Sequence, residues 1–254
     1  MNFYKTELHA HTSEVSPCAD LRAPEVAERY IAAGYTTVNV TNHYCDYVMD
    51  PAGETWQEKI DHFLSGYRIM KDYAKDRLNV LLGCELRFVG SMNDYLIFGL
   101  TEAFLIAHPD LHRMTLKSFS GLAKENGLLI VQAHPFRNGM MVSDPALLDG
   151  IEVFNGHPGH DSRNDIADLW AKKFRLLCTS GSDFHHPTSI ECAGIMTDTP
   201  VTNEQQLAGI LRDETYLLHC SGPAAERDRM HDMPAKYGKE ECNGTTADTS
   251  GQRA

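Results

Sequence analysis

Strand-like runs alternate with helical patterns along most of this chain, and that alternation limits the folds it can adopt. Thr36–Asn42 and Arg175–Asp183 are strand-like, whereas Ala23–Gly34 and Glu54–Asp76 carry apolar residues at helical spacing. Repeated strand–helix units predict a mostly parallel sheet. There are too many units for a small doubly wound domain, and no glycine-rich nucleotide fingerprint is present. We therefore expect an α/β fold, a closed or distorted TIM-like (β/α) barrel.

The barrel is expected to occupy residues 1–221 as one domain, because 254 residues with 42% hydrophobic content suffice for one large core. Residues 222–254 are polar, poor in β-branched apolar side chains and rich in Gly, Thr, Asp and Glu. This composition predicts a largely disordered C-terminal tail.

The charge of the chain excludes some functions. A formal net charge of −12 argues against a non-specific binder of nucleic-acid polymers or anionic membranes, although a metal could still attract a small phosphorylated substrate.

The chain has no apolar signal segment and no run near the roughly 18 apolar residues of a membrane span, so we expect a cytoplasmic protein. The seven cysteines are scattered and form no CxxC pair, which predicts reduced thiols.

Residues of metal-ligating types gather at the ends of the predicted strands. They are His9 and His11; His43; Glu85; His134; Asn155 and His157; and Asp183, His185 and His186. In a (β/α) barrel the carboxyl ends of the strands meet on one face, which holds the active site. Six such clusters at six strand ends predict a metal centre on that face.

The spacing of these residues favours shared metal ions. Residues two apart in an extended chain point the same way, so both imidazoles of His9-x-His11 can reach one ion, and Asp183-x-His185 repeats the arrangement. Mixed imidazole and carboxylate ligands suit Zn, Mn or Fe. The donors exceed what one ion needs, which indicates two or three divalent ions, with Glu85 as a bridge. An isolated charge in the apolar run around Glu85 would cost several kcal/mol, so it should be paired or bound to metal.

Other histidines have a simpler interpretation. A lone histidine is more often a hydrogen-bonded structural residue than a ligand, and His108 is predicted to lie in a loop. The structural interpretation applies to His62, His112, His160, His219 and His231.

The motifs ELHAHTSEVSPC, VTNHY, LLGCELRF, IVQAHPFR, IEVFNG and GSDFHHP resemble, in order and approximate spacing, those of the PHP (polymerase and histidinol phosphatase) family. The resemblance covers about residues 3–220. It implies a distorted (β/α)7 barrel with a trinuclear metal cluster that hydrolyses phosphoesters. The implied ligands are His9, His11, Glu85 and Asp183 for the first ion, Glu85 and His134 for the second, and His43 and His185 for the third.

The chain departs from the family pattern at two ligand positions. Many members have an Asp or His after the paired histidines as a further ligand of the third ion, and here the loop offers Glu14 or Asp20, of which Glu14 lies closer to the pair. Many members also have a histidine after the bridging glutamate. Asp94 could replace it here, or the second ion could be held more loosely.

The resemblance implies hydrolysis in which hydroxide from a metal-bridging water attacks phosphorus. Arg87 and Arg137 follow two of the ligand motifs, where they could clamp phosphate or could simply be surface arginines. His157 or His186 could protonate the leaving group, or could make structural hydrogen bonds.

Two other functions compete with this hypothesis. A metal-dependent amidohydrolase also uses a His-x-His pair on a barrel strand, although we see no lysine at a strand end for a carbamylated bridge. A non-catalytic regulatory module could keep the metal cluster only for stability.

The expected barrel accounts for most of the 254 residues, which favours a small substrate such as a nucleoside monophosphate or histidinol phosphate. The oligomeric state is left open.

Overall fold

The structure, a computed structural model, describes residues 3–225. Eleven strands lie in this part of the chain: β1 (Tyr4–Ala10), β2 (Tyr35–Val40), β3 (His43–Tyr44), β4 (Asn79–Leu82), β5 (Cys84–Arg87), β6 (Asp94–Phe98), β7 (Leu129–Gln132), β8 (Gly150–Asn155), β9 (Leu177–Gly181), β10 (Ala193–Thr197) and β11 (Leu217–Cys220). They form two hydrogen-bonded sheets, ordered β11-β10-β1-β2-β4 and β3-β5-β6-β7-β8-β9.

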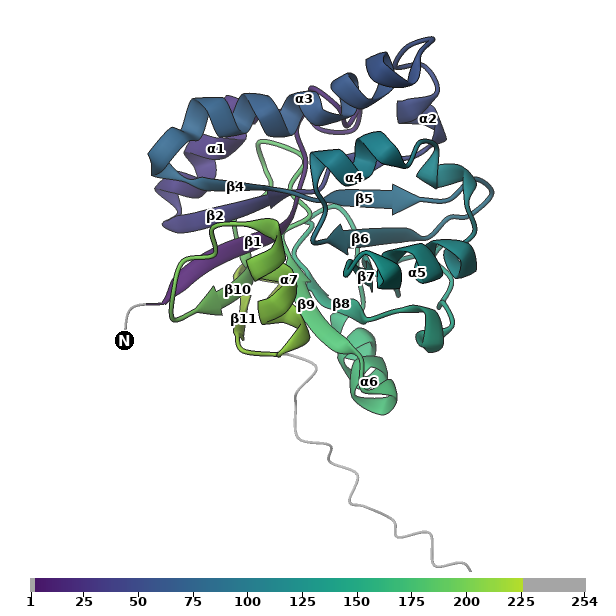
Figure 1. Ribbon diagram of the computed structural model, residues 1–254. Coiled ribbons are helices and arrows are strands. Elements are labelled where there is room, and N and C mark those ends of the chain that lie inside the picture. The colour runs from purple at the N-terminus through teal and green to yellow at the C-terminus, as the bar shows by residue number, and fades with distance from the viewer. Residues whose placement is uncertain (1–2, 226–254) are drawn as a thin grey trace, which may run out of the picture.

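The two sheets join into one distorted barrel. Short breaks separate β2 from β3 and β4 from β5, so each pair continues one strand from the first sheet into the second. The other junction lies after β9, where the His11 amide donates to the Phe184 carbonyl (3.0 Å) and the Phe184 amide to the His9 carbonyl (3.3 Å). The ring is therefore β1, β2/β3, β4/β5, β6, β7, β8 and β9, which confirms the expected distorted TIM-like barrel (Figure 1).

One strand of the ring runs in the opposite direction. β6 pairs antiparallel with both β5 and β7, whereas a mostly parallel sheet was expected. Only residues 88–93 connect β5 to β6, and a parallel crossover needs a dozen residues or more. The reversal places Asp94, the first residue of β6, opposite Arg87, the last of β5. Asp94 therefore lies at the same end of the barrel as the carboxyl ends of its neighbours.

Helices cover the outside of the ring and one of its ends. They are α1 (Ala23–Ala32), α2 (Asp46–Met49), α3 (Trp56–Ala74), α4 (Glu102–Ala107), α5 (Leu116–Glu125), α6 (Asn164–Phe174) and α7 (Glu204–Arg212), with short 3₁₀ turns at Lys75–Arg77, Leu111–Arg113 and Pro145–Leu147. Figure 1 shows α7 across the middle of the ring, where Leu207 and Leu211 pack into one core with Leu8, Leu96 and Leu129 from the strands. The end opposite α7 is thus left for polar residues.

The helical spacing of apolar residues noted in Glu54–Asp76 is confirmed by α3. Ile60, Phe63, Leu64 and Tyr67 are all buried, and they belong to the larger core between the helices and the sheet. α3 begins at Thr55, whose side chain accepts from the amide of Glu58. This cap satisfies a backbone donor at the start of the helix.

The predicted tail begins at residue 222, and its residues from 226 onward lie outside the described part of the chain. Its first residues do pack: Ala224 and Ala225 are buried against Phe154 and Cys192. The packed chain therefore extends beyond the predicted domain boundary at residue 221. Within residues 3–225, no helix combines the length and the apolar character needed to cross a bilayer.

A buried carboxylate shapes the end of β1. The register of β1 against β2 shifts after Glu7, and the freed amides of Leu8 and His9 both donate to Glu7 Oε1 (3.0 and 2.9 Å). Glu7 also accepts from the Ser182 amide (2.9 Å), the Ser182 hydroxyl and the Tyr30 hydroxyl. Glu7 therefore connects, through hydrogen bonds, the bulge that carries His9 and the loop that follows β9.

We expect Glu7→Ala to lower the free energy of unfolding by about 3–5 kcal/mol, because three buried amides lose their acceptor. Glu7→Gln keeps an acceptor oxygen and the side-chain shape, so its loss should be about 1 kcal/mol. Urea unfolding followed by circular dichroism measures both. Equal losses for the two variants would contradict this role of Glu7.

Candidate metal centre

The predicted ligand residues other than Glu14 converge at the end of the barrel opposite α7, which we call the barrel mouth. All of them are buried: His9, His11, His43, Glu85, Asp94, His134, Asp183 and His185. They come from β1 and the residue that follows it, from β3, β5 and β6, and from the loops after β7 and β9. The carboxyl ends of β1, β3, β5, β7 and β9 and the start of the reversed β6 therefore bring eight donors to one place.

Glu85 lies at the centre of the barrel mouth, within reach of four imidazoles. Its Oε1 is 3.0 Å from His134 Nε2 and 3.5 Å from His9 Nε2, and its Oε2 is 2.9 Å from His43 Nδ1 and 3.3 Å from His11 Nε2. The parallel register of β3 and β5 places His43 directly opposite Glu85. A carboxylate with donors on both oxygens has the position of a bridging ligand.

Asp183 approaches the same group from the opposite side. Its Oδ1 is 3.4 Å from His9 Nε2 and 3.2 Å from His185 Nδ1, and its Oδ2 accepts from Asn155 Nδ2 (3.1 Å). Both Asp183 and His134 have positive φ, 50° and 29°. Such backbone conformations are unfavourable outside glycine and cluster at functional sites.

The carboxylates and imidazoles shift one another's pKa values. Burial raises the pKa of Glu85, but the charges of His43 and His9 outweigh burial and hold this pKa well below its ordinary value. The pKa of Asp183 is likewise raised by burial and lowered much further by His9 and His185. Both carboxyl groups are therefore ionised in a buried site, where they attract cations.

His11 shifts in the other direction. Burial lowers its pKa, and nearby His185 and His43 lower it further, well below the ordinary value. His11 is therefore a neutral imidazole at pH 7, the form that binds metals. The pKa of His43 is lowered by burial but raised more by Glu85 and Cys18, to about 9.

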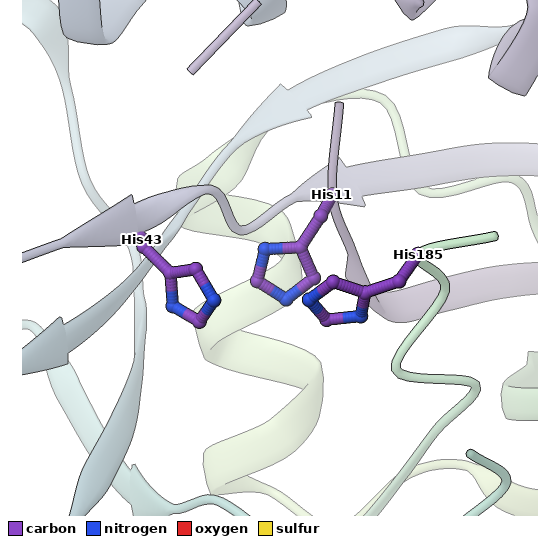
Figure 2. Close-up of side chains that lie close together, drawn as sticks. All are labelled: His11, His43 and His185. Carbon is purple, nitrogen blue, oxygen red and sulfur yellow. The ribbon is translucent and has the colours of Figure 1, made fainter. Parts of the chain in front are cut away.

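Several atoms at the barrel mouth that could bind a metal ion are buried but lack hydrogen-bond partners. They include His9 Nε2, His11 Nε2 and Glu85 Oε2. Unpaired buried polar atoms are costly, and a bound ion would satisfy them. The donors form four overlapping groups whose ligand atoms lie within 4.8 Å of one another: His9, His11 and Glu85; His9, His134 and Asp183; Glu85, Asp94 and His134; and His11, His43 and His185. Figure 2 shows the rings of the last group turned toward one another. Buried groups of this kind fit a multinuclear site.

Asp94 is shared between this centre and an arginine. Both of its oxygens bind Arg87, at 2.6 Å each, while its Oδ2 is 3.8 Å from His134 Nε2. A carboxylate has lone pairs for both partners. Asp94 thus lies near His134, and its role in place of the histidine that many PHP-family members have stays a prediction.

The two loop carboxylates considered as further ligands do not lie in the cluster. Both oxygens of Glu14 accept from the Ala23 amide at the start of α1 (3.1 and 3.0 Å), and Arg22 lies beside them. Asp20 instead binds His186 Nδ1 (2.8 Å) near the surface. The loop after β1 folds back onto α1, which directs Glu14 away from the barrel mouth.

Three residues not predicted for the site lie in or beside it. The Cys18 thiol is 3.2 Å from His43 Nε2, and His160 Nε2 is 3.5 Å from Asp183 Oδ2. Glu152, buried in β8, accepts from His9 Nδ1 (2.9 Å) and from the His134 amide (2.9 Å). A carboxylate within the apolar run GIEVFN could have identified Glu152 by the argument used for Glu85. No spacing rule in the sequence identified Cys18 or His160.

Burial raises the pKa of the Cys18 thiol, but hydrogen bonds with His185 and His43 outweigh burial and lower it to about 6. The other histidines, His62, His108, His112 and His219, belong to none of the four donor groups. His231 lies outside the described residues.

A pocket of about 440 Å³ opens beside the donors. It is lined by Cys18, His43, Tyr47, Glu85, Arg87, His134, Arg137, His157, Gly159, His160, Asp183, His185 and His186. This volume suits a small ligand. All four residues predicted to contact substrate, His157, His186, Arg87 and Arg137, therefore face one space.

We expect Glu85→Gln to lose at least one bound divalent ion per chain, because an amide is a weaker bridging ligand than a carboxylate. Elemental analysis of the purified protein measures this. Glu14→Gln, which changes a carboxylate of the neighbouring loop, should keep the wild-type metal content. The prediction fails if Glu85→Gln keeps it too.

No family model matches the sequence, and no curated protein matches it. Solved structures do resemble the fold. A two-domain protein from Bacteroides vulgatus that contains a predicted PHP-like metal-dependent phosphoesterase has a TM-score of 0.63 at 15% identity, over 86% of this chain and 65% of that one. This chain therefore spans less than two thirds of that protein.

Two further structures match over most of both chains. PsfC from Pseudomonas syringae PB-5123 has a TM-score of 0.62 at 15% identity, over 91% of this chain and 97% of that one. An amidohydrolase from Chromobacterium violaceum, solved with bound sulfate and no metal, has a TM-score of 0.51 at 16% identity, over 84% and 97%. The chain thus has the distorted barrel fold of PHP-like metal-dependent phosphoesterases, with buried His, Glu and Asp groups clustered at its mouth.

Proposed function

We propose that this chain is a metal-dependent phosphoesterase that hydrolyses small phosphomonoesters or phosphodiesters. The observation that carries the proposal is Glu85, a buried carboxylate contacted by four imidazoles beside a pocket with two arginines on its wall. The donor set suits two or three ions of Mn, Fe or Zn. The fold similarity to PHP-like phosphoesterases supports the same chemistry.

When bound, divalent ions would supply Lewis-acid activation of water and of the phosphoryl group. The residues around them keep the ligands in place. Glu152 accepts from His9 Nδ1, which leaves Nε2 of that ring directed at Glu85 and Asp183. Such outer hydrogen bonds fix the tautomer and orientation of ligating imidazoles.

Arg137 is the better candidate for binding the phosphate group. Two nitrogens of Arg87 are held by Asp94, whereas the Arg137 guanidinium has no carboxylate partner among the described residues. Arg163 donates to the Phe136 carbonyl and to the Asn138 side chain, on either side of Arg137. The loop that carries Arg137 is thereby fixed at the edge of the pocket, where a planar guanidinium can bind phosphate through two hydrogen bonds.

His186 suits proton transfer to the leaving group better than His157. Burial lowers the pKa of His157 to about 4, and its Nδ1 accepts from the Gly159 amide (2.9 Å), so this ring is neutral at pH 7. His186 Nδ1 is paired with Asp20 (2.8 Å), which orients the ring toward the pocket that it lines. His157 keeps an N–H that could donate to a phosphate oxygen.

The pocket favours a small substrate, such as a nucleoside monophosphate, a sugar phosphate or histidinol phosphate. Its volume is close to the lower end of the range for drug-sized ligands, and the net charge of −12 disfavours a nucleic-acid polymer. The similarity to an amidohydrolase makes amide hydrolysis the second candidate.

A substrate panel tests the proposal. The purified full-length chain, loaded with Mn²⁺, Fe²⁺ or Zn²⁺, is incubated with nucleoside monophosphates, sugar phosphates, histidinol phosphate, a generic phosphodiester and several amides. We expect release of phosphate or of the alcohol from an ester, and loss of this activity in His9→Ala while circular dichroism shows a retained fold. Amide turnover alone would favour the amidohydrolase, and no turnover by metal-loaded protein would favour a non-catalytic module.

Arg137→Ala should raise KM for the phosphoester about tenfold to hundredfold, because a charged hydrogen bond contributes about 1.5–3 kcal/mol. Steady-state kinetics measure this change. Arg77→Ala, which removes a surface arginine paired with Glu28, is the matched control and should leave KM unchanged. An unchanged KM in Arg137→Ala would assign Arg137 a role other than phosphate binding.

A further inference from the structure

His43 and His185 each direct Nδ1 at an oxygen atom. His43 Nδ1 lies 2.9 Å from Glu85 Oε2, and His185 Nδ1 donates to the Asp183 carbonyl (3.0 Å). The ionised Glu85 carboxylate and the Asp183 carbonyl can only accept hydrogen bonds. Nδ1 of each ring therefore carries a proton. Nε2 of each ring is then the atom that would bind a metal ion, on loss of any second proton, and Figure 2 shows the rings together with His11.

His11 also carries a proton on Nδ1, for a reason that lies in its hydrogen-bond network. The Thr12 amide donates to Asn42 Oδ1 (2.8 Å), which identifies that atom as the oxygen, and the Ser16 hydroxyl donates its single proton to the same atom (3.0 Å). Ser16 Oγ can then only accept from His11 Nδ1 (3.1 Å). His11 Nε2 is therefore a bare lone pair. It is fully buried and has no hydrogen-bond partner.

Cys18 lies at the open side of these three rings. Its sulfur is 3.2 Å from His43 Nε2, and Cys18 lines the pocket together with His43 and His185. A tetrahedral zinc ion with a Zn–S distance of about 2.3 Å and Zn–N distances of about 2.0–2.1 Å separates sulfur from nitrogen by roughly 3.5 Å. The observed separation is within a few tenths of an ångström of this value. The loop carboxylates Glu14 and Asp20 are engaged elsewhere.

We propose that Cys18 is a thiolate ligand of a metal ion held by His11, His43 and His185, in the place where carboxylate or imidazole was expected. This inference rests on the metal centre of the proposed function and extends it to one ion. Binding replaces the S–H bond of Cys18 by a sulfur–metal bond, and the released proton passes to solvent. Three imidazoles and one thiolate select zinc or ferrous iron over manganese, because thiolate is a soft ligand.

Cobalt spectroscopy tests this ligation without relying on activity. The metal-free, reduced full-length chain is titrated with Co²⁺, and near-ultraviolet thiolate-to-cobalt charge transfer is recorded beside the visible d–d bands. We expect both signals in the wild type. Cys18→Ser should lose the charge-transfer band and bind Zn²⁺ at this position at least about tenfold more weakly. Cys18→His should restore affinity without the band.

Cys178→Ser, which removes a half-buried thiol of β9 that does not line the pocket, is the matched control and should keep both signals. Peptide mapping after alkylation should show Cys18 protected by Zn²⁺ in the wild type. Visible d–d bands without charge transfer in the wild type, or charge transfer retained in Cys18→Ser, would overturn the role of Cys18 and leave the rest of the centre standing. Absence of cobalt binding would overturn the centre as well.

Discussion

The burial of Glu85 among four imidazoles is the constraint on which the rest of the structure depends. A carboxylate with almost no exposed surface in the middle of a barrel would be strongly destabilising alone. The histidines hold its pKa well below the ordinary value, so the charge persists and must be balanced. Several of the surrounding donors still lack partners, which is the property expected of a site built for cations rather than for its own hydrogen bonds.

The barrel is distorted where this arrangement requires it. The bulge after Glu7 directs His9 inward, and the same carboxylate reaches the Ser182 amide and hydroxyl beside Asp183. The reversal of β6 brings Asp94 to the barrel mouth from the start of a strand rather than from its end. Each departure from a regular parallel barrel places one donor, while α7 fills the opposite end with apolar side chains.

The sequence allowed the fold class and most of the site to be predicted, because strand ends in a barrel share one face and ligand residue types were visible there. Two errors have physical causes. The first error is the direction of β6. The residue pattern of a strand does not encode its direction, but the short link between β5 and β6 excludes a parallel crossover. Nearness in sequence favours Glu14 over Asp20 as the further ligand, but the loop folds onto α1 and presents Cys18 instead. Loop conformation depends on contacts such as that between Ser16 and Asn42, which no periodicity reveals.

The central claim is that the barrel mouth holds several cations at once, and anomalous X-ray diffraction from crystals of the metal-loaded wild-type chain tests it most directly. We predict two or three anomalous peaks at the barrel mouth, with at least two of them in contact with Glu85. A single peak away from Glu85, or no peak near these residues at saturating metal, would contradict it.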